Sequence, residues 1–267
     1  MRLIVEHQTH YEYSEVVRYA IERIYLSPIE SPSQRVIRWE LSGTGEIWTQ
    51  ADGHGNQVSM MVISKPTQQI SISVSGEVEL HPRYQEIGPS LMRQAGAVPV
   101  EHFLRSTPLT RGSADLQAFG RTHLLALTRD GLVALASAIE DRLVYTPGAT
   151  HVGSSALDAW ARGAGVCQDH AHVMLAICRS LGVPARYVSG YLAGEARASE
   201  ATHAWLECWA EGRWIGIDVT HRCEVADRWI RLAVGSDYES VSPIRGVRRG
   251  GGIELMRVLV SVRQASV

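Results

Sequence analysis

The sequence lacks an excess of charge of either sign. Its 267 residues include 26 lysines and arginines and 28 aspartates and glutamates, for a formal net charge of −2. Proteins that bind nucleic acid or an anionic membrane through charge present a basic surface, and no basic block occurs along this chain. We therefore expect neither nucleic acid nor a membrane among its partners. Hydrophobic residues make up an ordinary 45%, which excludes global disorder.

Long apolar runs are also lacking. The N-terminal stretch MRLIVEHQTHYEYS becomes polar too early to provide the apolar core of a signal peptide. The most apolar later segment, GLVALASAIEDRLVY, is interrupted by Glu140, Asp141 and Arg142 and is too short to span a bilayer. We predict a soluble, cytoplasmic protein.

Cysteine is scarce, and a chain of this length does not need a disulfide framework. The cysteines lie in the C-terminal part at spacings unlike such a framework, and we expect reduced thiols. They are Cys167, Cys178, Cys208 and Cys223. The paired spacings of structural zinc sites are missing, and no acidic loop of the calcium-binding type occurs. We therefore expect no metal ion and no cofactor.

A zinc alternative would have to use residues without the usual spacing. These are His170, His172, His221 and Cys223, together with Cys167. His170 and His172 are two positions apart and would lie on different sides of a helix. We interpret His172 as a helix residue that hydrogen-bonds within the fold, and Asp169 as a complement to the helix dipole.

The first eighty or so residues favour β-structure. Alternating apolar residues from Ile70 to Leu80, with serines between several of them, are typical of a strand with one buried face. The turn signal DGHGNQ joins the strand-like segments EIWTQ and VSMMVIS. We interpret residues 1–82 as an N-terminal β-sandwich domain and the proline-bearing residues 83–112 as a connector.

Residues 113–267 are predicted to form an α+β core with C-terminal strands. Apolar positions with helical spacing indicate two helices, broken near residues 128–131, before a helix that follows Gly165. That helix has one apolar stripe from Ala171 to Leu181, and Gly182 occupies its expected left-handed cap. Three strands follow, and the tail is interpreted as a loop, GVRRGGG, and a closing strand.

Cys167 lies in the predicted first turn of this helix. Free backbone N–H groups and the positive end of the helix dipole favour an anion there, either a thiolate or the oxyanion of a tetrahedral intermediate. The small residues Gly163, Ala164 and Gly165 let the chain turn sharply before it. Cys167 is therefore a candidate nucleophile, which requires a base and a group that orients the base.

His203 and Asp218 are predicted to supply these two functions from one hairpin. If Glu211 and Gly212 form its turn, Trp205 lies opposite Asp218, and His203 is the diagonal neighbour of Asp218 on the same face. Diagonal neighbours are close enough for a histidine–carboxylate hydrogen bond. Asp218 would then set the tautomer of the imidazole.

These motifs resemble the bacterial transglutaminase-like family, within the papain-like cysteine enzyme superfamily. The matching segments are GAGVCQDHAH, LGVPARYVSGYL, HAWLECW and the strand that ends in IDVT. The resemblance is strongest over residues 145–220, and it extends more loosely to the N-terminal region and to the tail VGSDYESVSPIRGV.

The resemblance implies a catalytic triad of Cys167 as nucleophile, His203 as general base and acid, and Asp218 as the orienting carboxylate. It also implies a cysteine helix packed on an antiparallel sheet. Two residues depart from the family pattern: Val219 stands where proline is usual, and His170, where an aromatic is common, adds a titratable group near the nucleophile.

Other candidates have simpler structural interpretations. Cys178 falls in the apolar stripe, and Cys208 points to the face opposite His203, so both are predicted to be core thiols. Trp205, Trp209 and Trp214 could line an acyl-donor groove, but we expect at least two of them to cover a sheet face. Neither Tyr145 nor Trp160 can be assigned as the second oxyanion donor.

The expected activity is acyl transfer or hydrolysis at amide bonds of peptides or proteins, through a thioester. Water as the second nucleophile would make the protein a protease or amidase, and an amine would make it a transglutaminase. The triad alone leaves both open. The alternative is a transglutaminase-like module that binds peptides or a partner enzyme without turnover.

Overall fold

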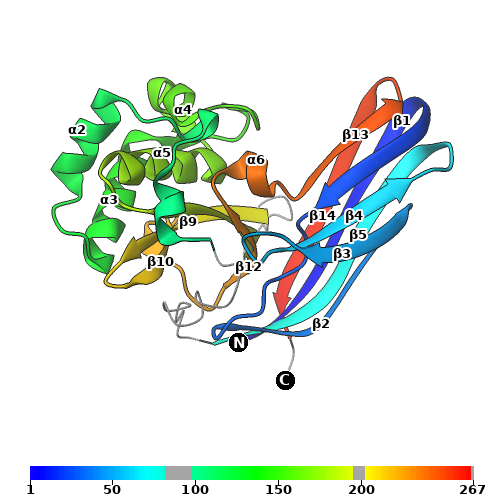
Figure 1. Cartoon of the computed structure of the whole chain (residues 1–267), viewed down its shortest axis with the longest axis horizontal. Coiled ribbons are helices and arrows are strands. Elements are labelled where there is room, and N and C mark those ends of the chain that lie inside the picture. The colour runs from blue at the N-terminus through cyan, green and yellow to red at the C-terminus, as the bar shows by residue number, and fades with distance from the viewer. Residues whose placement is uncertain (82–97, 195–201, 266–267) are drawn as a thin grey trace.

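A computed structural model describes residues 1–81, 98–194 and 202–265 of the chain. Two lobes lie side by side in Figure 1. One is a large antiparallel sheet, and the other is a smaller sheet covered by helices. None of the described helices is long and apolar enough to cross a membrane.

The larger sheet has seven strands and is organised around the 23-residue strand β1 (Arg2–Ile24). Its main path runs β2-β5-β1-β4-β3, and two further strands also pair with β1. The other members are β2 (Gln34–Gly43), β3 (Glu46–Ala51), β4 (Gln57–Ile63), β5 (Thr67–Leu80), β13 (Ile244–Gly250) and β14 (Glu254–Gln264). The strand pair on either side of DGHGNQ forms as predicted. The N-terminal region is β-rich, but its strands belong to one sheet, where the sequence suggested a sandwich.

The last two strands differ from their sequence-based assignment to the catalytic core. β13 and β14 both pair with β1 in the N-terminal sheet, and β13 includes most of GVRRGGG, which was expected to be a loop. The reason is the length of β1. Its first half pairs with β5 along one side, so its other side is available to β14, from Leu3 opposite Gln264 to Tyr13 opposite Glu254.

The smaller sheet has the strand order β11-β10-β9-β8-β12. Its strands are β8 (Ala185–Leu192), β9 (Thr202–Ala210), β10 (Arg213–Asp218), β11 (Cys223–Glu224) and β12 (Trp229–Gly235). The β9–β10 hairpin turns at Glu211 and Gly212, with φ of 54° and 75°, as expected for a two-residue turn with two left-handed positions. Its register, which includes Leu206 opposite Ile217, is the predicted one.

Helices cover this second sheet (Figure 1). The central one, α5 (Cys167–Ser180), packs against β8 and β9, and α2, α3 and α4 surround it. These are α2 (Ala114–His123), α3 (Arg129–Arg142) and α4 (Ala156–Arg162), with α6 (Tyr238–Val241) beside β8 and β12. Short elements complete the lobe: the 3-10 turns Val100–Leu104 and Pro108–Thr110, and the strand pair β6 (Val144–Tyr145) and β7 (Ala164–Gly165). The helix pair near residues 128–131 and the cap at Gly182 form as predicted.

Gly190 is required by the packing of β8 against its neighbours. A Cβ at this position would overlap the carbonyl oxygen of Ile230 and the buried ring of Trp205. We expect Gly190→Ala to destabilise the protein by about 1–3 kcal/mol, because core overpacking forces strain on the backbone. Thermal unfolding measures the effect, with Gly53→Ala as the control, since a Cβ there meets nothing within 4 Å. Equal melting temperatures for the two variants would contradict this account.

Candidate active site

Cys167 is the first residue of α5, and its side chain is half-buried. It lines a cavity of about 280 Å³ between the two lobes. His203 and Tyr187 line the same cavity from the smaller sheet, and Tyr11 and Met256 line it from the larger one. The candidate nucleophile therefore lies where the two lobes meet.

Asp169 holds the start of α5 in place. Its Oδ2 accepts hydrogen bonds from the Val166 N–H at 2.8 Å and from the Thr150 hydroxyl at 2.6 Å. Burial raises the pKa of Asp169, and these two hydrogen bonds oppose that shift. Gly165 is needed for this close approach, because a Cβ there would lie 2.6 Å from the Cβ of Asp169. The small residue before Cys167 thus lets the capping carboxylate reach the backbone.

His203 and Asp218 form a buried pair, with Nε2 of the imidazole 2.6 Å from Oδ2 of the carboxylate. The predicted hairpin register brings them together. Burial acts to lower the pKa of His203, but the charge and hydrogen bond of Asp218, with a hydrogen bond to Cys167 and its charge, raise it to about 10. Because Nε2 is engaged by Asp218, Nδ1 is the ring nitrogen left for Cys167.

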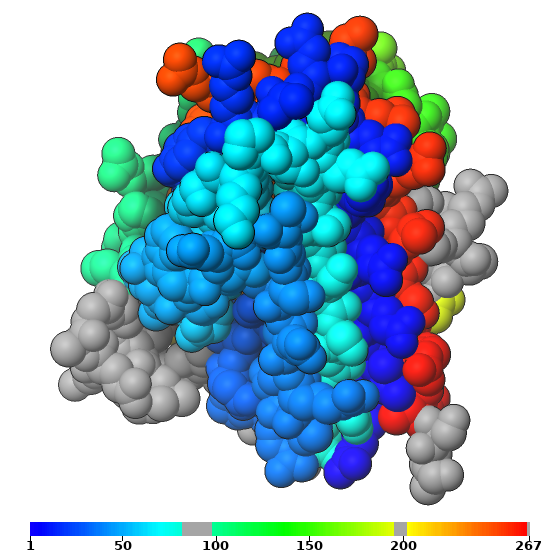
Figure 2. Space-filling view, turned by 90° about the vertical axis from the view of Figure 1, so that its right-hand side faces the viewer, coloured from blue at the N-terminus to red at the C-terminus, as the bar shows by residue number. Residues whose placement is uncertain are grey.

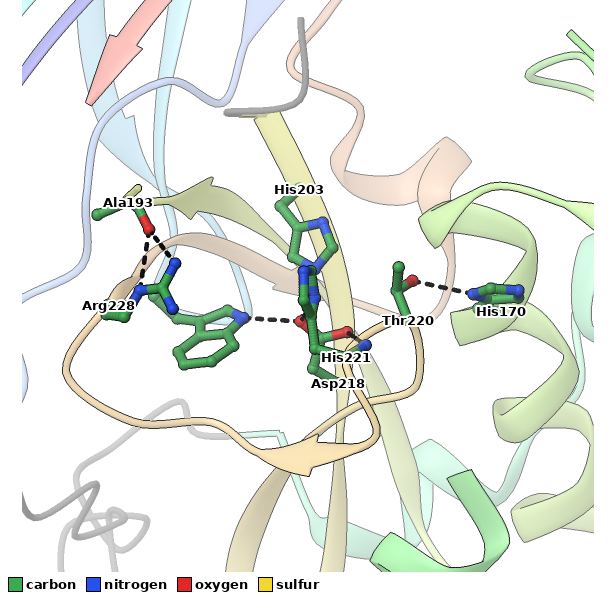
Figure 3. Close-up of polar contacts among 8 residues, drawn as sticks. His170, Ala193, His203, Asp218, Thr220, His221 and Arg228 are labelled. Carbon is green, nitrogen blue, oxygen red and sulfur yellow. Dashed lines mark hydrogen bonds and ion pairs between the residues drawn. The ribbon is translucent and has the colours of Figure 1, made fainter. Parts of the chain in front are cut away.

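Asp218 accepts hydrogen bonds from two more side chains (Figure 3). Nδ1 of His221 lies 2.8 Å and Nε1 of Trp229 lies 2.9 Å from Oδ2, and the His221 backbone N–H donates to Oδ1 at 3.1 Å. Burial acts to raise the pKa of Asp218, but the charge of His203 and the hydrogen bonds of His203 and His221 hold it well below its ordinary value. The carboxylate is therefore ionised and fixed in position.

Sequence reasoning did not find the contacts of His221 and Trp229 with Asp218. His221 follows Asp218 by three residues in a turn, and that spacing was an available signal. Trp229 lies on a different strand, β12, and nothing in the local pattern connects it with the site.

Trp229 offers a test of how firmly Asp218 must be held. We expect Trp229→Phe, which keeps an aromatic ring but removes the N–H, to destabilise the protein by about 1–3 kcal/mol, because a buried carboxylate loses a donor. It should also raise the pKa of His203, because a carboxylate with fewer competing donors is a stronger acceptor for the imidazolium proton. Thermal unfolding and an NMR titration of His203 measure the two effects. An unchanged stability and titration would show that this hydrogen bond is dispensable.

The side chains of His203, Asp218 and His221 also form a cluster of metal-ligand types, with one ligand atom from each within 4.8 Å of the others. Hydrogen bonds account for their mutual contacts, because one nitrogen of each imidazole ring bonds to the same carboxylate oxygen of Asp218. The cluster shares only His221 with the zinc alternative drawn from the sequence. The arrangement therefore does not require a metal.

His170 and His172 are buried in α5 and hydrogen-bonded within the fold. His170 bonds through Nδ1 to the Thr220 hydroxyl at 2.9 Å, toward which it points in Figure 3, and through Nε2 to the Leu143 carbonyl at 2.8 Å. Nε2 of His172 accepts from the Tyr238 N–H at 3.1 Å, as predicted. Burial lowers the pKa of both, that of His172 to about 4. His170 does not line the cavity, but the charges of Asp218 and His203 act on its pKa.

The remaining cysteines lie away from the cavity lining. Cys178 and Cys208 are fully buried, as predicted, with their sulfur atoms 3.7 Å apart. Cys223 is half-buried in β11 opposite Asp218, and burial followed by the charge of Asp218 raises its pKa to about 11. Cys167 is the cysteine that faces both the cavity and His203.

The tryptophans of the second sheet serve its packing. Trp205 and Trp214 are each 1% exposed, which confirms the expectation that at least two of the three cover a sheet face. Trp209 stacks edge-on against Trp214. Tyr145 and Trp160 lie near His170 and Phe119 and are not part of the cavity lining.

Comparison with known sequences connects each lobe to a protein family. The profile of the transglutaminase-like superfamily matches residues 122–219, which contain Cys167, His203 and Asp218, and that of the bacterial transglutaminase-like N-terminal region matches residues 3–79. An uncharacterised protein of Mycobacterium leprae is 31% identical over 274 residues, covering 98% of each chain. A protein-glutamine gamma-glutamyltransferase of Pseudomonas aeruginosa is 32% identical over 102 residues, covering 33% of this chain and 15% of its own.

A solved structure has the same arrangement of both lobes. It is a candidate cysteine protease from Cytophaga hutchinsonii, similar with a TM-score of 0.79 and 21% sequence identity, covering 100% of this chain and 91% of the other. At that identity the comparison is informative about fold alone.

Proposed function

Because the chain belongs to the bacterial transglutaminase-like family, we propose that it is a cysteine enzyme that attacks amide bonds of peptides or proteins. The supporting observation is the ionised Asp218 bonded to His203, which in turn reaches Cys167 at a helix start. A cysteine nucleophile requires a base that removes its proton and a third group that orients the base. The proposed roles are nucleophile for Cys167, general base and acid for His203, and orienting carboxylate for Asp218.

The first half-reaction forms a thioester. The thiolate of Cys167 attacks the amide carbonyl, and the N–H groups of the first helical turn face the developing oxyanion. As the C–N bond breaks, the His203 imidazolium donates its proton to the departing amine or ammonia. The acyl group remains on sulfur. Asp218 keeps the proton of Nε2 in place, so that Nδ1 exchanges the catalytic proton.

The second half-reaction returns the thiol. Water or a primary amine attacks the thioester while His203 removes a proton from this attacking molecule, and the C–S bond then breaks. Hydrolysis gives a carboxylic acid, and aminolysis gives a new amide. Support for aminolysis comes from the gamma-glutamyltransferase relative, whereas the triad by itself is equally compatible with hydrolysis. The acyl-enzyme is common to both.

Alkylation distinguishes an enzyme from a module that only binds. Iodoacetamide at neutral pH should modify Cys167 faster than Cys223, which burial protects, and His203→Ala should slow the reaction at Cys167. Equal rates at the two cysteines, unaffected by His203→Ala, would contradict the proposal and favour a binding module. Incorporation of a fluorescent amine into N,N-dimethylcasein, compared with release of peptide fragments, then separates transferase from hydrolase.

A further inference from the structure

The wall opposite Cys167 is built by the two ends of the chain. Residues of β1, including Thr9 and Tyr11, and residues of β14, Met256 and Val258, line the same cavity as Cys167. Tyr11 lies opposite Met256 and Thr9 lies opposite Val258 in the β1–β14 ladder. The N-terminal sheet therefore presents a strand pair to the candidate nucleophile.

β14 is the edge strand of this pair. Among the described strands it pairs with β1 alone. In Figure 2, β14 runs in red along the margin of the sheet, with β1 in blue beside it. An edge strand presents a row of unpaired backbone groups that can bind another extended chain. Met256 is 54% exposed and Leu259 is 63% exposed, so apolar side chains accompany this edge.

The hydrogen bonds at the ends of the ladder show which residues direct their backbone groups outward. The Ala265 N–H donates to the Arg2 carbonyl at 3.0 Å, and the Ile253 carbonyl accepts from the Ser14 N–H at 3.0 Å. Between these points the pairing has no bulge. Because alternate residues of an antiparallel strand face the partner, the odd-numbered residues of β14 bond to β1. The even-numbered ones, from Met256 to Val262, direct N–H and C=O away from β1, to an edge at which no other described strand pairs.

The same alternation places side chains of the even-numbered residues toward the cavity. Met256 and Val258 both line it, and successive side chains of a strand point to opposite faces. A chain paired with this edge would thus continue the sheet, and every second side chain would lie on the face where Cys167 is found. The even-numbered residues of β14 therefore carry both the backbone groups that point away from β1, in the plane of the sheet, and the side chains that face the cavity.

We propose that an extended segment of a polypeptide substrate binds by adding a strand to the open edge of β14, at Met256 and Val258. The inference rests on the proposed function, because it concerns the substrate of the same cavity. It specifies the substrate class as an unfolded or looped protein segment with apolar residues near the reactive amide. Continuity of the edge with the catalytic cavity favours this occupant over a second copy of the chain, which would pair β14 with β14 and cover the rim of the cavity.

Residue-resolved hydrogen exchange tests the docking without turnover. The probe is N,N-dimethylcasein, an unfolded protein, added to the Cys167→Ala variant until exchange no longer changes. The even-numbered amides from Met256 to Val262 should exchange at least about tenfold more slowly, while the odd-numbered ones, already bonded to β1, change little. No change in β14, or protection of odd and even amides alike, would overturn the proposal. Protection that appears without casein and grows with protein concentration would assign the edge to a second copy instead.

A backbone variant supplies a kinetic test. Val258→Pro removes one outward N–H but leaves the ladder with β1, since proline is tolerated on the open side of an edge strand. Val258→Ala keeps that N–H and is the matched control. The ratio of the rate with dimethylcasein to the rate with the short donor benzyloxycarbonyl-Gln-Gly should fall about fivefold in Val258→Pro, the size expected for one lost backbone hydrogen bond. In Val258→Ala the ratio should change less than about twofold.

The two tests separate this inference from the proposed function. If the wild type turns over neither probe but casein still protects the even-numbered amides of β14, the proposed chemistry fails and the docking stands. If both probes react and Val258→Pro leaves the ratio unchanged, the chemistry stands and the docking fails. Thermal unfolding of Val258→Pro and the alkylation rate of its Cys167 show whether the fold is retained.

Discussion

Replacement of Cys167 by serine is expected to reduce amide turnover by roughly 10⁴-fold or more, the scale on which removal of an enzyme nucleophile acts. The serine hydroxyl keeps the size of the side chain but is far less acidic than a thiol, so His203 cannot form a comparable anion at neutral pH. Release of ammonia from benzyloxycarbonyl-Gln-Gly and amine incorporation into dimethylcasein measure the loss.

Cys223→Ser is the matched control for this variant. Cys223 is half-buried and absent from the cavity lining, and its replacement should change the rate by no more than about twofold, as for most substitutions away from critical contacts. If Cys167→Ser kept more than a small fraction of wild-type turnover, Cys167 would not be the nucleophile. The acyl-enzyme mechanism would then be wrong.

The second large effect is expected from Asp218→Asn, which keeps the size of the side chain but removes its charge. We expect turnover to fall by about 10²–10⁴-fold, as when a carboxylate that orients a catalytic histidine is neutralised. In the wild type, burial acts to lower the pKa of His203, and Asp218 is the leading cause of its rise to about 10. Without that charge, burial dominates and the imidazolium loses its proton at lower pH.

The pH dependence of alkylation measures this shift. In the wild type, the imidazolium that accompanies the Cys167 thiolate should persist to near pH 10, whereas in Asp218→Asn the alkaline transition should move down by more than one pH unit. The same pKa shifts make the free energy of unfolding depend on pH. A folded pKa of about 10 against the ordinary 6.5 of histidine contributes stability that is complete below pH 6.5 and is lost toward pH 10. Asp218, with its pKa lowered, contributes stability that is lost as the pH falls below 3.8.

A matching pH profile of alkylation in wild type and Asp218→Asn would contradict the role of the carboxylate. Asp237→Asn is a suitable control. Asp237 is another buried aspartate, which caps the short helix α6 through the Ser240 N–H at 2.9 Å and lies outside the cavity lining. It should affect stability without moving the alkaline transition at Cys167.

The candidate site was largely predictable from short-range patterns. The apolar stripe from Ala171 to Leu181 sets the phase of α5 and so places Cys167 at its start. The turn at Glu211 and Gly212 sets the register of β9 and β10, and that register brings His203 to Asp218. Both inferences need only a helical period of 3.6, a strand period of 2 and the geometry of a two-residue turn. They hold wherever the segment is placed in the molecule.

The contacts that hold Asp218 and close the cavity were decided by tertiary structure. Trp229 reaches Asp218 from β12, which pairs with β8 on the far side of the sheet. Neither the helical period nor the strand period of the sequence relates the position of Trp229 to that of Asp218. A sequence pattern can show that a segment forms a strand, but it cannot show which free edge the strand will occupy.

The closing strand illustrates that division. The sequence alone determined that residues near the C-terminus form a strand, that Cys167 begins a helix, and that His203 and Asp218 share a hairpin face. Only the tertiary structure decided that β14 joins β1 and so faces Cys167 across the cavity. The physical reason is that periodicity and turn geometry act between neighbours along the chain. Strand pairing over some 250 residues depends instead on which edge the rest of the fold leaves open.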